Sequence, residues 1–160
     1  MSRIHVMSDN LANKISAGEV VERCSSVLKE LVENSIDAKS KSVVVDLFDS
    51  GTKSIKVTDD GIGMDREDAS LAFQRHATSK LIKDDDLFFI NTLGFRGEAL
   101  PSIASVSKVT LITSQGDVGT KLVLDGGNLV SDSKSDARRW TIIEVRDLFY
   151  NTPARLKYLN

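Results

Sequence analysis

Cysteine, histidine and proline are scarce in this chain of 160 residues, and long hydrophobic runs are absent. The single cysteine, Cys24, excludes an intramolecular disulfide and a cysteine cluster for zinc, and it suits a reducing compartment. His5 and His76 have no partners at metal-ligand spacing, so we expect no zinc site. No apolar run approaches the roughly 20 residues that cross a bilayer, and the first residues lack the apolar core of a signal peptide. We therefore expect a cytoplasmic protein with no membrane partner.

The charge balance is not that of a dedicated nucleic-acid-binding protein. Lysine and arginine together number 21 and aspartate and glutamate 23, which leaves a formal net charge of −2. Proteins that bind DNA through its phosphates carry a clear basic excess on one surface. Any contact with DNA must therefore come from a local patch, from a partner chain or from sequence outside these residues. The hydrophobic fraction of 41% is that of a globular domain.

The common loops that bind nucleotide phosphates are also missing. No G-x-x-x-x-G-K-[ST] string occurs, and the fragment Gly51–Ser54 lacks the upstream glycine that such a loop requires. No G-x-G-x-x-G dinucleotide signature follows a strand, and no motif supports a serine, histidine and aspartate triad. Nucleotide binding, if present, must use another arrangement.

The periodicity of apolar residues indicates both helices and strands. A period of 3.6 predicts helices over Ser8–Val20 and Ser25–Ala38, with Ser25 or Ser26 as the cap of the second. Shorter helices are predicted after the cap residue Asp65, after Gly97 and from Pro153. Strands are predicted over 42–49, 54–59, 108–114, 120–125 and 140–147. Helices, a hairpin, further helices and then a meander of strands predict an α+β layered sandwich.

The second predicted helix carries polar side chains at the edge of its apolar face. Glu30 and Asn34 are one turn apart there, and Asp37 follows on the same flank. The oxygen of an asparagine amide is a hard ligand for magnesium, and a glutamate one turn away can orient and deprotonate a water molecule. The alternative is that these residues only form the solvated flank of an amphipathic helix.

Asp59 ends a predicted strand and is followed by two closely spaced glycines. Strand alternation places Asp59 on the same face as Ile55 and Val57, which we expect to be buried. A buried carboxylate needs a donor, and the exocyclic amine of a purine is one, while Gly61 and Gly63 let the backbone pass close to a flat ligand. The alternative is an ordinary turn at the end of a strand.

A third candidate site is the string Gly94–Leu100. Two glycines flank Arg96 immediately before a predicted helix, so free backbone N–H groups and the positive end of the helix dipole meet there. This combination predicts an anion site. The alternative is a glycine turn that only begins a helix.

These three candidates occur in an order that resembles the ATPase clan of gyrase, heat-shock chaperones, histidine kinases and MutL. Within this clan the chain resembles the MutL family of DNA mismatch-repair proteins almost throughout. The strings that carry the resemblance are Leu11–Arg23, Lys29–Ala38, Arg75–Lys80, Gly94–Leu100 and Phe149–Arg155. The resemblance implies a Bergerat-type fold, with helices packed on one face of a mixed, largely antiparallel sheet.

The resemblance also implies roles for individual residues. Glu30 is expected to be the catalytic base for the attacking water, and Asn34 the residue that holds magnesium at the phosphates of ATP. Asp59 is expected to accept from the adenine amine, and the segments 78–80 and 94–100 to form a lid over the phosphates. The expected ATP-binding residues are Asn34, Asp37, Asp59, Gly61, Gly63, Thr78, Ser79, Lys80, Gly94, Phe95, Arg96, Gly97, Glu98, Ala99, Leu100 and Thr141.

For the whole protein, the resemblance implies a bacterial-type ATPase that dimerises on binding ATP. That dimer is expected to meet a MutS-type mismatch-recognition protein, and to contact DNA weakly or only in full length. Residues 1–160 are expected to form the ATP-binding domain and to stop before the second, transducer domain, whose lysine reaches the γ-phosphate. We therefore expect weak ATP binding and very slow or absent hydrolysis by this fragment alone.

Four positions depart from the family pattern, and one of them is Asp60, which stands where asparagine is frequent. Cys24 stands where proline is usual, and Lys39 and Trp140 stand where glycine is common. Two other functions remain as alternatives: another ATPase of the same clan, or an interaction module that keeps the fold without hydrolysing nucleotide.

Overall fold

The computed structural model describes residues 9–74, 99–136, 138–157 and 159. The helices in these residues are α1 (Asp9–Val20), α2 (Cys24–Asp37), α3 (Arg66–Leu71), α5 (Ala99–Ser105) and α6 (Pro153–Leu156), with a 3-10 turn, η1, at Asp49–Gly51. The strands are β1 (Val43–Phe48), β2 (Ser54–Asp59), β3 (Lys108–Ser114), β4 (Gly119–Asp125), β5 (Asn128–Ser135) and β6 (Trp140–Arg146). None of the described helices is long and apolar enough to cross a membrane.

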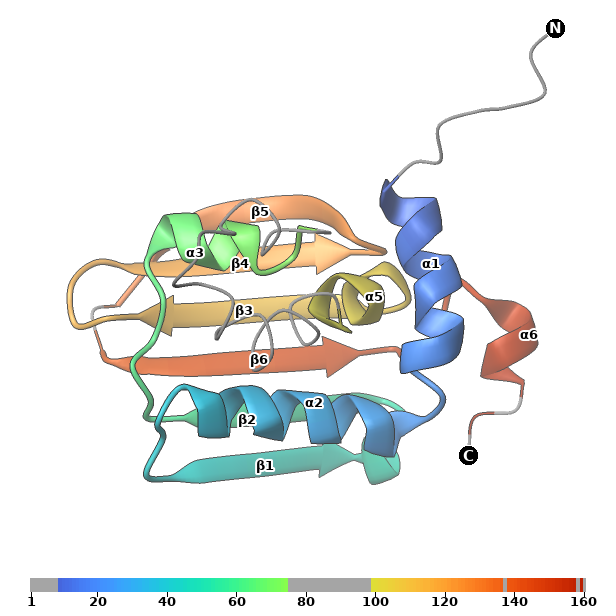
Figure 1. Ribbon diagram of the computed structural model, residues 1–160, viewed down its shortest axis with the longest axis horizontal. Helices are drawn as coiled ribbons and strands as arrows, with labels where there is room; N and C mark the ends of the chain where they lie inside the picture. The colour runs from blue at the N-terminus through green and yellow to red at the C-terminus, as the bar shows by residue number, and fades with distance from the viewer. Residues whose placement is uncertain (1–8, 75–98, 137, 158, 160) are drawn as a thin grey trace, which may run out of the picture.

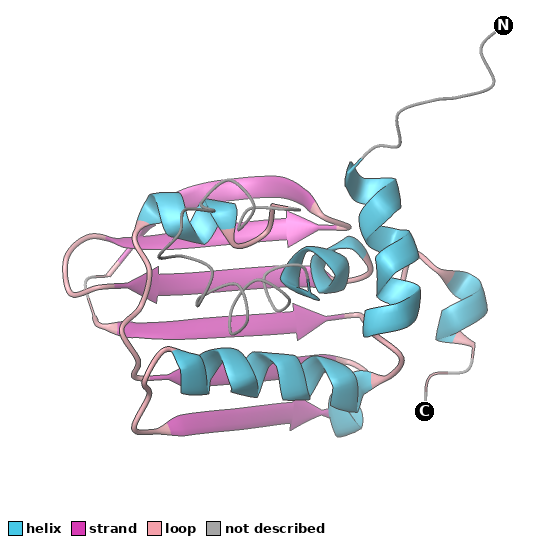
Figure 2. Ribbon diagram, in the orientation of Figure 1, coloured by secondary structure: helices cyan, strands magenta, loops and turns pink. Residues whose placement is uncertain are grey.

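The described strands form one six-stranded sheet in the order β1-β2-β6-β3-β4-β5. Every pair of neighbouring strands in it is antiparallel. Helices α2, α3 and α5 lie over one face of the sheet, and α1 and α6 lie beyond one end of it (Figures 1 and 2). The α+β sandwich predicted from the sequence is therefore confirmed.

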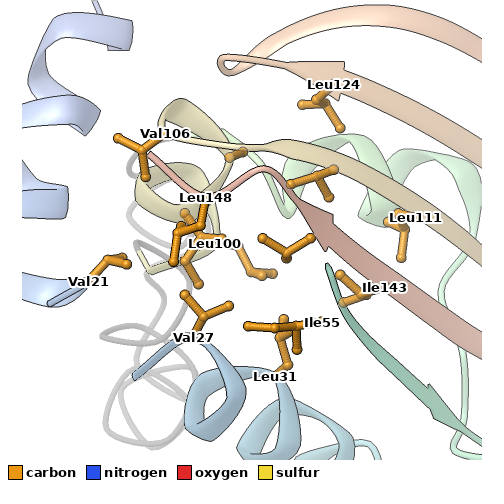
Figure 3. Close-up of a cluster of buried hydrophobic side chains, with 14 of the residues drawn as sticks. Val21, Val27, Leu31, Ile55, Leu100, Val106, Leu111, Leu124, Ile143 and Leu148 are labelled. Carbon is orange, nitrogen blue, oxygen red and sulfur yellow. The ribbon is translucent and has the colours of Figure 1, made fainter. Parts of the chain in front are cut away.

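Alternation along the inner strands builds the core between this face and the helices. Residues 55 and 57 of β2, 109 and 111 of β3, and 143 and 145 of β6 are buried, whereas residues 56, 58, 108, 110, 112, 142 and 144 beside them are partly exposed. Val27 and Leu31 of α2 and Leu100 of α5 meet these side chains (Figure 3), and Ile103 of α5 belongs to the same cluster. The helix predicted after Gly97 is confirmed as α5, and all of its side chains are buried.

The beginning of α2 differs from its prediction. The helix begins at Cys24, its N-cap residue is Arg23, and no side chain caps it, so neither Ser25 nor Ser26 acts as the cap. Packing explains the difference, because Cys24 and Leu28 lie against the core and extend the helix beyond the local capping signal. The 3.6-residue period would place Ile36 on the apolar face of α2 with Val27 and Leu31, but Ile36 is 64% exposed.

The end of α2 forms a Schellman motif. The N–H of Lys39 donates to the carbonyl of Ile36 at 2.9 Å, and the N–H of Ser40 donates to that of Ser35 at 3.3 Å. Lys39 lies at φ 61°, in the left-handed region that favours glycine. This gives a physical reason for the glycine that the MutL pattern commonly has at this position.

Two further predictions had different outcomes. Asp65 caps α3 as predicted, because its side chain accepts from the N–H of Asp68 at 2.8 Å. The spacing of Ala69, Ala72, Phe73 and His76 favours a longer helix, but α3 ends at Leu71, and His76 lies outside the described residues. Strand β5 was not predicted, since most of its side chains are polar and almost all are exposed; it forms through backbone pairing with β4 at the edge of the sheet.

Candidate functional site at the end of strand β2

Asp59 is the last residue of β2, and it is buried although charged side chains normally stay in water. Its exposed fraction is 6%, and it continues the buried face of Ile55 and Val57, as the strand alternation predicted. The register places it between Val43 of β1 and Thr141 of β6. Two strand neighbours and the end of α2 therefore surround this carboxylate.

Two donors hold the carboxylate of Asp59. The hydroxyl of Ser35, on α2, donates to Oδ2 at 2.7 Å, and the backbone N–H of Gly61 donates to Oδ1 at 2.9 Å. A carboxylate offers about four lone-pair positions, so these two bonds leave acceptor capacity unused. Ser35 is 3% exposed and was not predicted to take part in the site. It links Asp59 directly to the helix that carries Glu30 and Asn34.

The adjacent Asp60 has a different environment. It is exposed, and its Oδ1 accepts from the backbone N–H groups of Lys41 at 2.8 Å and Ser42 at 2.9 Å. The N–H of Ser42, followed by that of Lys41, holds the pKa of Asp60 below its usual value, because both favour the charged carboxylate. Asp60 therefore joins the loop before β1 to the end of β2.

The glycines after Asp59 have protein neighbours where a side chain would be. A Cβ at Gly61 would lie 2.7 Å from the carbonyl oxygen of Ala38, and one at Gly63 would lie 2.0 Å from that of Ser114. Gly63 also has φ 70°, which disfavours other residues. The structure thus gives both glycines a packing role: they let this loop lie against α2 on one side and β3 on the other.

Thr141 begins the buried face of β6, next to Asp59. Its exposed fraction is 6%, and its Oγ1 lies 2.8 Å from Oγ1 of Thr113 on β3. Thr113 is fully buried and accepts from the backbone N–H of Met64 at 3.0 Å. Thr113 was not predicted from the sequence. The alternation of the strand could have identified it, because Thr113 follows Val109 and Leu111 at alternate positions on the buried face and yet is polar.

The predicted polar flank of α2 is half-buried. Val27, Leu31 and Ser35 form the buried face of the helix, and Glu30, Asn34 and Asp37 lie at its margin. Among the described residues, Nδ2 of Asn34 is buried without a hydrogen-bond partner. An amide that is not held by the protein can turn either its oxygen or its nitrogen toward a ligand.

The structure does not place the whole predicted site. Thr78, Ser79, Lys80 and residues 94–98 lie outside the described residues. Ala99 and Leu100, which are described, begin α5 and bury their side chains, with Leu100 in the core (Figure 3). The residues brought together at the end of β2 are therefore Asp59, Gly61, Gly63 and Thr141, with Ser35 and Thr113 as additions.

The sequence pattern of the histidine kinase-, DNA gyrase B- and HSP90-like ATPases matches residues 22–151, and the chain belongs to this family. Within it, the chain is similar to MutL proteins. It is 59% identical to the DNA mismatch repair protein MutL of Bacillus pumilus and 61% identical to that of Geobacillus thermodenitrificans, over 99% of this chain in each case. It spans 25% of the length of these curated relatives.

Solved structures agree with this assignment. The crystal structure of the N-terminal domain of a DNA repair protein superposes with a TM-score of 0.76 at 34% identity, over 96% of this chain and 45% of that one. The Aquifex aeolicus MutL ATPase domain complexed with ADP superposes with a TM-score of 0.67 at 34% identity, over 88% of this chain and 49% of that one. The predicted resemblance to the MutL ATPases is thereby confirmed.

Proposed function

We propose that residues 1–160 form an ATP-binding domain that takes adenine at the end of β2. The observation that carries this proposal is the buried carboxylate of Asp59, which has two internal donors and acceptor capacity left over. An exocyclic amine would use that capacity, and a buried charge without such a partner is costly. Gly61, Gly63 and Thr141 adjoin Asp59 and would surround the base. The family match and the similarity to an ADP-bound MutL domain support the same ligand.

Magnesium fits the donor set on α2. The buried amide of Asn34 has a nitrogen without a partner among the described residues, so the protein leaves this group available. The same residues contain no group of three His, Cys, Asp or Glu side chains that could hold a metal alone. A magnesium ion that takes few protein ligands keeps water and phosphate oxygens as the others. When bound, it would neutralise charge on the phosphates.

The remaining residues of α2 take roles near the phosphates. Glu30 lies one turn before Asn34 on the half-buried flank, where its carboxylate would orient the attacking water and accept its proton. Asp37 lies three residues after Asn34 and would contact the nucleotide from the same flank. Two segments would close over the phosphates as a lid, as the family resemblance implies: Thr78–Lys80 and Gly94–Leu100.

The wider proposal is that this domain serves a cytoplasmic, bacterial-type MutL protein in DNA mismatch repair. Closure on ATP would drive dimerisation and couple a MutS-type recognition protein to repair on DNA. Identities of 59% and 61% to two MutL proteins support this role. Phosphoryl transfer also needs cationic groups at the phosphates, and the family resemblance places one such lysine beyond these 160 residues. We therefore infer that this chain alone binds ATP weakly and hydrolyses it slowly or not at all.

The site is tested by comparing two neighbouring aspartates. Asp59→Asn removes a charged acceptor, and we expect it to weaken ADP binding by about 1.5–3 kcal/mol. Asp60→Asn, the matched control, changes an exposed carboxylate and keeps an oxygen for Lys41 and Ser42, so ADP affinity should stay unchanged. Isothermal titration calorimetry gives both affinities, and thermal melting checks that each variant folds. Equal ADP affinities in Asp59→Asn and the unaltered chain would refute the proposed adenine site.

The wider role is tested in cells. The matching quarter of Bacillus pumilus MutL is replaced by this chain, and the chimera is expressed in a strain that lacks its own MutL. We expect a low mutation rate with the chimera and a high one when it also carries Asn34→Ala. A high mutation rate with a stably expressed, unaltered chimera would contradict the proposed role.

A further inference from the structure

Thr113 has hydrogen bonds that set the direction of its bond to Thr141. It is fully buried on β3, and its Oγ1 accepts from the N–H of Met64 at 3.0 Å and lies 2.8 Å from Oγ1 of Thr141. In the Thr113–Thr141 pair, either hydroxyl could be the donor from distance alone. The other bonds of Thr113 decide between the two directions.

If Thr141 donated, Thr113 would accept twice and its own hydroxyl hydrogen would need another acceptor. Among the described residues, the hydrogen bonds of Thr113 include no such acceptor. A buried hydroxyl hydrogen without an acceptor is costly, and donation from Thr113 to Thr141 leaves the one unpaired hydrogen on Thr141, which is 6% exposed, and not on the fully buried Thr113. The direction is therefore from Met64 to Thr113 and from Thr113 to Thr141. The hydroxyl hydrogen of Thr141 then remains for a ligand.

Asp59 and Thr141 stand opposite each other on β2 and β6, and both belong to the buried face. Opposite residues on antiparallel strands have Cα atoms about 4.5–5.5 Å apart, so the two side chains are neighbours. Together they present an acceptor, the carboxylate, beside a donor, the hydroxyl. Adenine has the complementary pair, since its 6-amino group donates and its ring nitrogen N1 accepts. Hypoxanthine has the reverse, with an oxygen at position 6 and a hydrogen on N1.

We propose that Thr113 is a positioning residue for base selection: it favours donation by Thr141 and so favours adenine over 6-oxopurines. This inference rests on the proposed function, because it takes the base to lie against Asp59 and Thr141. Thr113 itself does not touch the nucleotide. It acts by occupying one of the two acceptor positions of Thr141, which reduces the acceptor capacity open to a hydrogen on N1.

The test measures affinities for ADP and for inosine diphosphate by calorimetry. Thr113→Val removes the donor to Thr141, which can then turn and accept from the N1 hydrogen of inosine. We expect the ratio of ADP affinity to inosine diphosphate affinity to fall about fivefold to tenfold, the value of one hydrogen bond. Thr113→Ala removes the same hydroxyl and leaves a smaller side chain, so it replaces the valine variant if that variant does not fold. Thr113→Ser keeps the hydroxyl, so it should retain the unaltered ratio.

Thr120→Val is the matched control. Thr120 is buried on β4 and stands opposite Thr113, one strand farther from Asp59. We expect this control to lower the melting temperature as much as Thr113→Val does, but to leave the affinity ratio unchanged. A purely structural role for Thr113 would lower both affinities together and would leave the ratio alike in all variants.

Failure of this inference differs from failure of the proposed function. An unchanged ratio in folded Thr113→Val and Thr113→Ala, with ADP still weakened by Asp59→Asn, overturns the role of Thr113 alone. ADP binding that is insensitive to Asp59→Asn overturns the adenine site and this inference with it. A ratio that falls in Thr120→Val as far as in Thr113→Val also overturns the inference.

Discussion

Polar groups are buried at both ends of the sheet, but their hydrogen bonds differ between the two ends. At one end, where β2 and β3 finish and β6 begins, Asp59 and Thr141 make bonds that leave hydrogen-bonding capacity over. The opposite end, where α5 leads into β3 and β6 leads to α6 (Figure 1), contains Ser105 and Ser107. Their hydroxyls donate to the carbonyls of Ser102 and Ile103, both at 2.6 Å. We call these the Asp59 end and the Ser105 end.

Longer side chains at the Ser105 end also serve the fold. The guanidinium of Arg155 donates to the carbonyls of Ala17 at 2.9 Å and Val21 at 2.6 Å, at the end of α1, and lies over the ring of Phe149. A cation at these carbonyls is favourable, since they carry the negative end of the helix dipole. The hydroxyl of Tyr150 donates to Asp125, and burial followed by this bond raises the pKa of Tyr150 to about 12.

This comparison teaches that burial of polar groups does not by itself mark a ligand site. What differs is where the bonds go. Most polar side chains at the Ser105 end donate to backbone carbonyls of the same fold, so this end stabilises the structure. At the Asp59 end, a charged acceptor and a hydroxyl remain able to bind a further group. The comparison can be tested by changing one end at a time.

The largest expected effect on stability is at the Ser105 end. Arg155→Met keeps an apolar stem over Phe149 but removes both bonds to α1, and we expect a loss of about 1.5–3 kcal/mol in the free energy of unfolding. Urea denaturation measures the loss. ADP affinity of the folded variant should remain that of the unaltered chain. Weaker ADP binding by Arg155→Met, with an unchanged free energy of unfolding, would contradict the distinction between the two ends.

A smaller effect of opposite sign is expected beside the Asp59 end. Lys39 has φ 61°, a conformation that costs a non-glycine residue roughly 1–2 kcal/mol, and the greater freedom of glycine in the unfolded chain offsets part of this. Lys39→Gly should therefore raise the free energy of unfolding by about 1 kcal/mol. Lys39→Ala, the control, keeps the strain and should not. Equal stability of the two variants would show that the left-handed backbone is not the cause.

The sequence predicted those parts of the site that depend on local periodicity. Alternation in β2 placed Asp59 on the buried face, and the 3.6-residue period placed Glu30 and Asn34 at the margin of α2; burial confirms each of these placements. The cap at Asp65 was also predicted, because it depends on residues only three positions apart. Local rules were sufficient in these cases.

What the sequence did not predict depends on contacts between distant residues. Ser35 meets Asp59 across 24 positions, and Thr113 meets Thr141 across 28, so neither bond leaves a local signal. Strand β5 has no apolar alternation because one neighbour, β4, supplies its pairing and its side chains remain exposed. The cap of α2 was mispredicted because packing of Cys24 overrides the preference of serine for that position.

The central claim is that the Asp59 end and the flank of α2 together bind ATP through magnesium. Calorimetric titration of the 160-residue chain with a non-hydrolysable ATP analogue, with and without magnesium, tests it most directly. We expect weak binding that tightens when magnesium is added, and loss of that gain in Asn34→Ala, because no other amide on this flank replaces its oxygen. Binding that is the same with and without magnesium, or a full magnesium gain in folded Asn34→Ala, would contradict the account.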